Sequence, residues 1–163
     1  MIEIVILYIL TKYDATIYRV CKIVDELFFP FLKSSTGTIN PAIKRLEKIG
    51  AVECLNKMTE GGMFSKTYSI TKLGKKHLSD LMLSFKEENP YHIINEAKIL
   101  MYCSEYLSVS EKIEFKENLL NILELHKIKI EKGLKNEYIS LNPLQKELVI
   151  NTQNEIEGLI KLL

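Results

Sequence analysis

The fold is decided by residues 34–50, SSTGTINPAIKRLEKIG. The small hydroxyl residues at the start are typical helix caps, and Gly50 suits the left-handed residue that ends a helix. Between them an apolar residue recurs every three or four positions, at Ile39, Ile43, Leu46 and Ile49. This spacing predicts a short helix with one buried side. Its other side carries amide and cationic groups, which a DNA major groove accepts.

Pro41 constrains where this helix begins. Proline is tolerated in the first turn of a helix, where its missing N–H has no partner to lose. We therefore expect Thr38 to be the N-cap and Asn40 to lie near the helix start, where base edges are read.

Two helices are expected before this stretch. Residues 2–12 are almost entirely apolar and suit either a buried strand or a helix, with Leu7 and Leu10 slightly favouring the helix. Asp14 or Thr16 can cap a second helix over about 16–28. A second helix followed by a basic amphipathic third is the helix-turn-helix pattern.

A glycine-tipped hairpin is predicted directly after Gly50. Its strands would be 51–55 and 64–70, joined through Thr59-Glu60-Gly61-Gly62, a connection flanked by Lys57 and Lys66. The Gly-Gly pair lacks the spacing of a phosphate-binding loop. A helix-turn-helix followed by a basic hairpin predicts a winged helix.

A fourth helix, capped by Thr71, is expected to run to about residue 85. Lys72, Lys75 and Lys76 in its first turns are either solvated lysines or contacts to DNA backbone. The polar residues 86–89 predict a boundary. We therefore expect a winged-helix DNA-binding domain over 1–85 and a C-terminal helical dimerisation domain over 86–163, in a fold that is mainly α with a small β-hairpin.

Three helices are predicted in the C-terminal part. Asn89-Pro90 opens the first over 90–107, Ser108 and Glu111 form a capping box for a long second helix, and Asn142-Pro143 opens the third. The long helix has two apolar stripes, so it must be covered on two sides. A second copy of the chain would cover it and set two recognition helices one DNA turn apart. An intramolecular three-helix bundle is the alternative.

Charge is concentrated around the third helix. The 163 residues carry a net charge of +1, but residues 1–85 carry +4, residues 86–163 carry −3, and residues 30–77 carry +6. Such a basic region indicates a nucleic-acid partner. The three cysteines have no metal or redox spacing, which suggests free thiols in a reducing cytoplasm. Residues 2–10 are too short to span a bilayer, so we expect a cytoplasmic protein without membrane contact.

No catalytic, metal or cofactor site is expected. The three histidines, His77, His92 and His126, lie far apart on separate predicted helices, and no triad or carboxylate pair is visible. The sequence therefore disfavours an enzyme.

Two segments resemble the PadR family of bacterial transcriptional regulators. Residues 37–50 are similar to the family's Gly-Thr-hydrophobic-Tyr-Pro-x-Leu-x-Arg-Leu-Glu-x-x-Gly segment, and residues 66–74 to its wing strand. Tyr18 matches a family tyrosine in the second helix. Residues 96–163 resemble the C-terminal extension of the longer, virulence-activator-like members. The resemblance implies a winged-helix dimer that represses its genes and is released by a small aromatic effector.

We predict two sets of binding residues. The DNA contacts would be Thr36, Thr38, Asn40, Lys44, Arg45, Lys48, Lys57, Lys66 and Tyr18. The resemblance also implies an effector pocket between the two domains, with Phe85, Tyr91, Met101 and Tyr102 as candidate lining residues, although such side chains at helical spacing also suit an ordinary core.

Two positions depart from the family pattern. Asn40 stands where the family has a tyrosine, and Ile17 where it has a glycine. Asn40 can hydrogen-bond a phosphate or an adenine edge, so it is the expected source of this chain's own specificity. The alternative to operator binding is a winged helix whose basic face meets an acidic protein.

Overall fold

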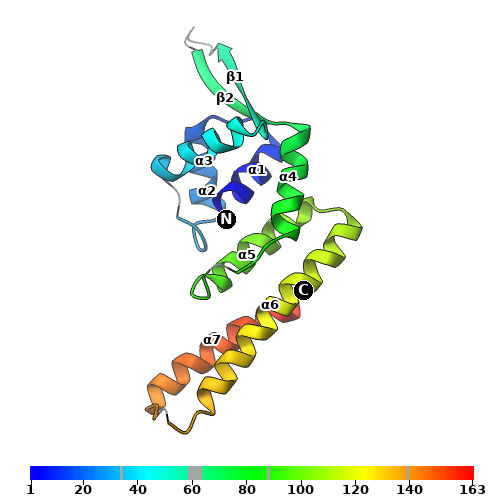
Figure 1. Cartoon of the computed structure of the whole chain (residues 1–163). Coiled ribbons are helices and arrows are strands. Elements are labelled where there is room, and N and C mark those ends of the chain that lie inside the picture. Colours follow the sequence, from blue (N-terminus) through cyan, green and yellow to red (C-terminus); the bar gives the residue numbers. More distant parts are fainter. Residues whose placement is uncertain (34, 59–63, 88, 139) are drawn as a thin grey trace.

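The structure is a computed structural model that describes residues 1–33, 35–58, 64–87, 89–138 and 140–163. Its elements, in chain order, are α1 (Ile2–Lys12), α2 (Ile17–Leu27), α3 (Thr36–Lys48), β1 (Val52–Met58), β2 (Phe64–Ile70), α4 (Lys72–Leu83), α5 (Ile93–Cys103), the 3₁₀ turn η1 (Ser104–Tyr106), α6 (Val109–Leu134) and α7 (Pro143–Leu162). The predicted order of elements and the class, mainly α with one hairpin, are confirmed (Figure 1).

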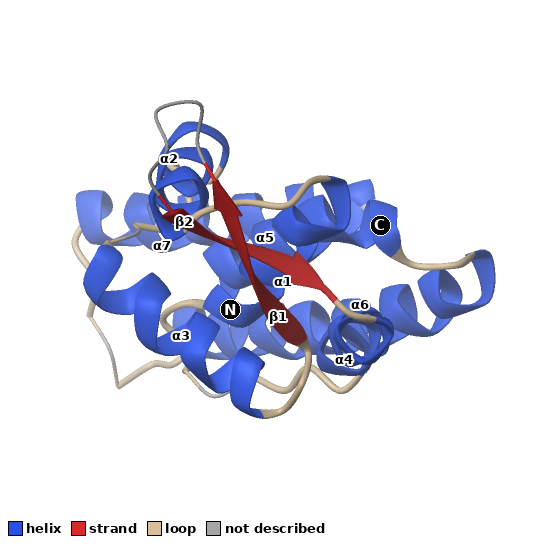
Figure 2. Ribbon diagram, turned by 90° about the horizontal axis from the view of Figure 1, so that it is seen from above, coloured by secondary structure: helices blue, strands red, loops and turns tan. Residues whose placement is uncertain are grey.

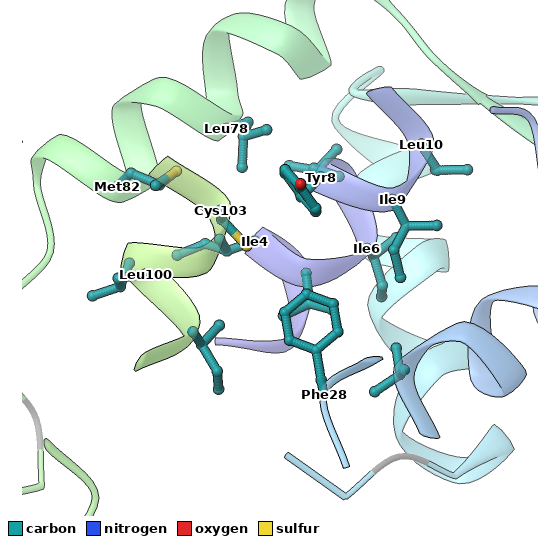
Figure 3. Packing of buried hydrophobic residues seen from close by; sticks show 14 of the residues in the cluster. Ile4, Ile6, Tyr8, Ile9, Leu10, Phe28, Leu78, Met82, Leu100 and Cys103 are labelled. Carbon is teal, nitrogen blue, oxygen red and sulfur yellow. The ribbon is translucent and has the colours of Figure 1, made fainter. Parts of the chain in front are cut away.

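Helix α1 is the centre of the fold. Every residue from Ile4 to Leu10 is buried, and α1 contacts α2, α3, α4, α5 and β2. A helix covered on all sides shows no apolar period, which is why the sequence also suited a strand. Figure 3 shows Ile4 near Cys103 of α5, with Phe28 also packed beside α1.

Helix α3 begins three residues earlier than a cap at Thr38 would place it. Ser35 is its N-cap, and Ser35 and Thr38 form a reciprocal capping box. The expectation that Thr38 caps the helix is therefore wrong. Pro41 lies inside the helix, and it is exposed. The Gly37 carbonyl that loses its N–H partner there belongs to an exposed residue, so water can replace the missing bond.

The hairpin pairs β1 with β2 in antiparallel register, from Val52 opposite Ile70 to Met58 opposite Phe64. A backbone bridge that the sequence did not predict joins Ala15 to Tyr68 on the other edge of β2, with N–O distances of 3.0 and 2.8 Å. The predicted tip, residues 59–62, lies outside the described residues. Seen from above, the hairpin crosses over α1 (Figure 2).

Three apolar side chains in or next to these helices are only partly buried. Leu27, Ile49 and Leu73 are about half exposed. Leu27 is the last residue of α2 and Ile49 the residue after α3, where the packed part of each helix ends. Phe28, which follows Leu27, is fully buried in its place.

Two of the three C-terminal helices begin at their predicted caps, and the first begins later than predicted. The capping box at Ser108 and the cap at Asn142 are confirmed, and Gln145 completes a second box with Asn142 that was not predicted. Asn89 instead forms a turn, in which its side-chain oxygen accepts from Tyr91 N at 3.0 Å, and α5 begins at Ile93. Helices α6 and α7 pack against each other and project from the rest as an arm (Figure 1).

Candidate nucleic-acid interface

The outward face of α3 is polar and basic. Ile39, Ala42, Ile43 and Leu46 are all completely buried against the core. At 100° per residue the opposite side of the helix carries Gly37, Pro41, Lys44 and Lys48, all exposed. Neither lysine makes an ion pair with a described residue. The two ammonium groups are therefore available to an anionic partner.

The flanks of this face hold the other predicted groove residues. Asn40 is partly buried on one flank, with Thr36 exposed one turn before it. On the other flank, Thr38 Oγ1 accepts from Ser35 N at 3.1 Å and donates to the Ser35 carbonyl at 2.9 Å. The hydroxyl of Thr38 is thus engaged in the helix end. A base contact through this hydroxyl would break the capping box.

Arg45 also has a partner in the protein. Its Nε donates to Glu3 Oε1 of α1 at 2.8 Å. The sequence predicts Arg45 among the groove contacts because it lies off the apolar stripe of the helix. The structure instead ties it to the first turn of α1, 42 residues away.

The wing adds one described cation. Lys66 on β2 is exposed, whereas the side chain of Lys57 lies outside the described residues. The hairpin extends away from the helices, with α3 beside its base (Figure 1). Lys72, Lys75 and Lys76 are exposed in the first turns of α4, which follows β2 directly.

Helix α2 offers a second exposed surface, of mixed charge, that the predicted set included only through Tyr18. Tyr18 is 75% exposed and lines a shallow hollow together with Arg19 and Lys22. The N-terminus of α2 is capped by Thr16, whose hydroxyl accepts from Arg19 N at 3.2 Å. The sequence could have pointed to Arg19 and Lys22 as well. They follow Tyr18 by one and four residues, on the helix that precedes the predicted recognition helix.

The four predicted effector residues do not surround one cavity. Phe85 lines a hollow at the end of α4, and Tyr91 lines another between α5, α6 and α7. The ring of Tyr102 packs edge-on against Tyr8 and Phe28, with centroids 5.9 and 4.8 Å apart. Met101 is partly buried beside the core. These three aromatic side chains and one methionine therefore lie at separate places in the fold.

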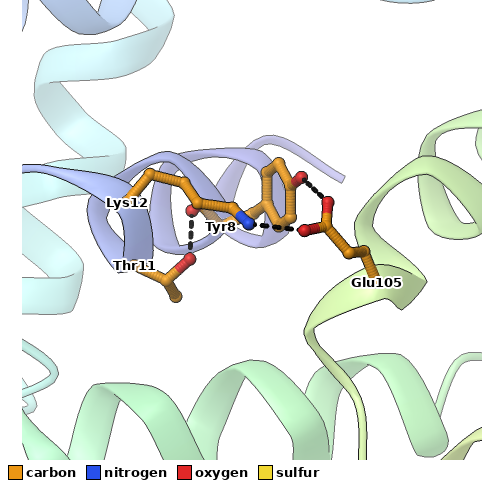
Figure 4. Close-up of polar contacts among 4 residues, drawn as sticks. All are labelled: Tyr8, Thr11, Lys12 and Glu105. Atoms are coloured by element: carbon orange, nitrogen blue, oxygen red, sulfur yellow. Dashed lines mark hydrogen bonds and ion pairs between the residues drawn. The ribbon is translucent and has the colours of Figure 1, made fainter.

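Polar contacts join the winged part to the C-terminal helices (Figure 4). Glu105 of η1 accepts from Tyr8 Oη at 2.9 Å and from Lys12 Nζ at 2.8 Å. The Lys12 and Tyr8 hydrogen bonds hold the pKa of Glu105 below its usual value, and burial with Glu105 nearby raises the pKa of Tyr8. The phenol therefore stays protonated while the carboxylate stays charged.

The other titratable groups of the described residues are spread over several helices. His126 is buried on α6 and contacts the Glu87 carboxylate, while His77 and His92 lie on or beside other helices. Burial raises the pKa of the Cys103 thiol to about 12, so it is not a nucleophile at neutral pH. Within the described ranges, no three His, Cys, Asp or Glu side chains lie close enough to hold a metal ion. No helix in those ranges is both long and apolar enough to cross a membrane.

Three helices with a hairpin at the third helix's end, and a free basic face on that helix, define a DNA-binding winged helix. The sequence pattern of the Transcriptional regulator PadR-like family matches residues 6–80. A PadR family transcription regulator from Clostridium difficile R20291 is 31% identical over 48% of this chain and 80% of its own, with a TM-score of 0.43. The chain therefore belongs to the PadR-like family of transcriptional regulators.

Two further solved structures are similar along nearly the whole chain. Bacillus subtilis PadR in complex with operator DNA is 19% identical over 98% of this chain and 96% of its own, with a TM-score of 0.49. The Vibrio cholerae virulence activator AphA is 19% identical over 99% of this chain and 89% of its own, with a TM-score of 0.42. No curated protein matches the chain.

Proposed function

We propose that this regulator binds operator DNA as a homodimer, with α3 in the major groove and the wing on adjacent backbone or minor groove. The observation that carries the proposal is the outward face of α3, where Lys44 and Lys48 are exposed, without an ion-pair partner among the described residues, on a helix whose other side is fully buried. A rigidly seated helix can enter a groove without rearranging.

The predicted contacts receive different roles. Thr36, Asn40 and Lys44 would face base edges, and Lys48 would meet backbone. Tyr18 on α2, and Lys57 and Lys66 on the wing, would reach flanking phosphates. In a helix-turn-helix the helix before the recognition helix, here α2, crosses the DNA backbone. Thr38 would hold the helix end, because its hydroxyl is engaged there.

Replacing Lys44 and Lys48 together by alanine should weaken binding to an upstream promoter fragment. Each phosphate-neutralising lysine adds about 0.9 to the steepness of log K against log salt, so losing the backbone contact of Lys48 should make the slope shallower by about 0.9 per protomer. Fluorescence anisotropy titrations at several salt concentrations measure both quantities.

A matched control removes the same charge elsewhere. Lys132 and Lys135 are exposed near the end of α6, far from α3 in the chain and in the fold (Figure 1). Their double alanine variant should leave the slope nearly unchanged. If the two double variants behave alike, α3 is not the DNA-binding helix, and the alternative of an acidic protein partner gains support.

Dimerisation is supported by apolar side chains that the described part of the chain leaves uncovered. On the α6–α7 arm the exposed ones are Val109, Ile113, Leu120, Leu125, Ile128, Leu144, Leu148, Ile150 and Leu162. A set of this kind on a projecting arm is typical of an interface. A second copy of the arm would cover it and bring two α3 helices to one operator.

Repression and release by a small aromatic molecule complete the proposal. The effector would bind in the hollow that Tyr91 lines, which measures about 480 Å³ and has walls from α5, α6 and α7. Its lining is mostly apolar, with His126, Lys129 and Thr152 as polar groups. This combination of apolar walls and few polar groups is usual for small-molecule sites.

A further inference from the structure

The ion pair between Arg45 and Glu3 joins the recognition helix to the core helix. Arg45 Nε lies 2.8 Å from Glu3 Oε1, and the Arg45 side chain is 61% exposed while that of Glu3 is 27% exposed. The carboxylate is thus the more enclosed partner. The guanidinium remains open to a ligand that approaches α3 from solvent.

The bond uses only one edge of the guanidinium. A guanidinium is a rigid plane with five N–H donors, and the contact with Glu3 occupies the one on Nε. Within the described residues, the terminal nitrogens of Arg45 make no further hydrogen bond. Because the group is planar, fixing Nε also fixes the direction in which the two terminal nitrogens point.

Arg45 stands on the flank of the outward face of α3, next to Lys44 and one turn before Lys48. A planar fork of N–H donors at this place matches the bidentate geometry of a phosphate. We propose that Glu3 is a positioning residue, which holds Arg45 so that its free N–H groups meet a DNA phosphate beside the groove. This inference rests on the proposed DNA binding, and it makes Arg45 an oriented backbone contact.

The two possible roles of Glu3, repelling DNA by its charge and orienting Arg45, predict opposite changes in DNA affinity when Glu3 is replaced. A carboxylate near DNA repels phosphate, so its removal alone should strengthen binding. If Glu3 orders Arg45, its removal leaves a long side chain to be immobilised on binding, which costs about two- to tenfold in Kd. The sign of the change therefore separates the two roles.

The test is the Kd of Glu3→Gln for the operator fragment, measured at fixed salt and well below the thermal midpoint. Glu3→Gln should raise Kd about two- to tenfold, the range expected for one ordered side chain. Glu3→Asp keeps the charge but shortens the side chain, and it should also raise Kd. Thermal melts followed by circular dichroism show that each variant is folded.

The matched control is Glu47→Gln on α3 itself. Glu47 is exposed and has no ion pair with a described residue. Loss of its charge should leave Kd unchanged or lower it. In an Arg45→Ala background, Glu3→Gln should add no further loss, because the side chain that it positions is gone.

Two results would overturn the inference while leaving DNA binding in place. One is a Glu3→Gln variant that binds as tightly as the wild type or tighter. The other is an equal loss with and without Arg45, which would mean that Glu3 acts by another route. If the wild type shows no salt-dependent DNA binding, the proposed function fails as well.

Discussion

Glu105 is an exposed carboxylate whose two hydrogen-bond donors, Tyr8 and Lys12, both come from α1 (Figure 4). Their hydrogen bonds favour the charged form and hold the pKa of Glu105 below its usual value. A group with a lowered pKa in the folded state stabilises the fold above its unfolded pKa, which is about 4.3 for a glutamate. That contribution disappears as the pH falls through the folded-state pKa.

The Glu105→Gln variant should therefore be less stable than the wild type at pH 7. The difference in free energy of unfolding should shrink as the pH falls below about 4, where glutamate protonates. Urea unfolding of both proteins between about pH 3 and pH 7 measures it. Glu117→Gln, at an exposed position of α6, is the control. A Glu105 difference that is independent of pH would contradict the role of its charge.

At the scale of elements, two glycines allow the hairpin and α4 to meet. Gly50 has a φ of 72°, a conformation that side chains other than glycine rarely adopt. Gly74 lies against the start of β1, where an added Cβ would be 1.9 Å from the Ala51 carbonyl oxygen. Thr71 closes the same junction, since its hydroxyl donates to the Gly50 carbonyl at 2.7 Å.

Gly74→Ala should lower the free energy of unfolding by about 3 kcal/mol, because backbone must move to admit the methyl group. Gly158→Ala in α7 is the matched control, since an added Cβ there has no neighbour within 4 Å. The control should gain about 0.5–1 kcal/mol from its higher helix propensity. Chemical denaturation of both variants measures these changes. Equal effects at the two sites would refute the close approach of α4 to β1.

At the scale of the whole molecule, the winged part and the C-terminal helices share one buried cluster. Residues of α1 and of α5 belong to it, and Asn118 of α6 donates to the Leu83 and Phe85 carbonyls at 3.2 and 3.1 Å. The division into domains at residues 85 and 86 remains a prediction. These contacts make the junction a defined interface, through which, in the proposed dimer, the arm would set the spacing of the two recognition helices.

The proposed dimer can be tested on the arm. Ile113 and Leu120 are seven residues apart on one face of α6 and are 58% and 37% exposed. Glutamate at both positions should halve the mass found by light scattering at micromolar concentration, because a charged pair cannot be buried without a partner. The control places glutamate at Ser110 and Asn121, which are exposed polar positions on α6. A wild-type monomer, or a dimer unchanged in Ile113→Glu/Leu120→Glu, would contradict the proposal.

Local signals were sufficient for most elements and for part of the candidate site. The caps at Thr71, Ser108 and Asn142 formed as predicted, and Thr16, one of two candidates, caps α2, because each cap involves residues three apart in the chain. The exposed basic face of α3 followed from its 3.6-residue period. The predicted effector pocket did not form as a set, because the residues around a cavity depend on how separate helices pack.

The sequence by itself determined the order of the elements after residue 12, the hairpin and the basic face of residues 34–50, since these depend on short-range spacing and turn chemistry. Only the tertiary structure decided that Arg45 is held by Glu3 and that Glu105 is held by α1. Those partners lie 42 and up to 97 residues away in the chain. These pairs meet because α1 is buried at the centre of the fold, where its residues reach Arg45 on α3 and Glu105 on η1. No local sequence pattern encodes that arrangement.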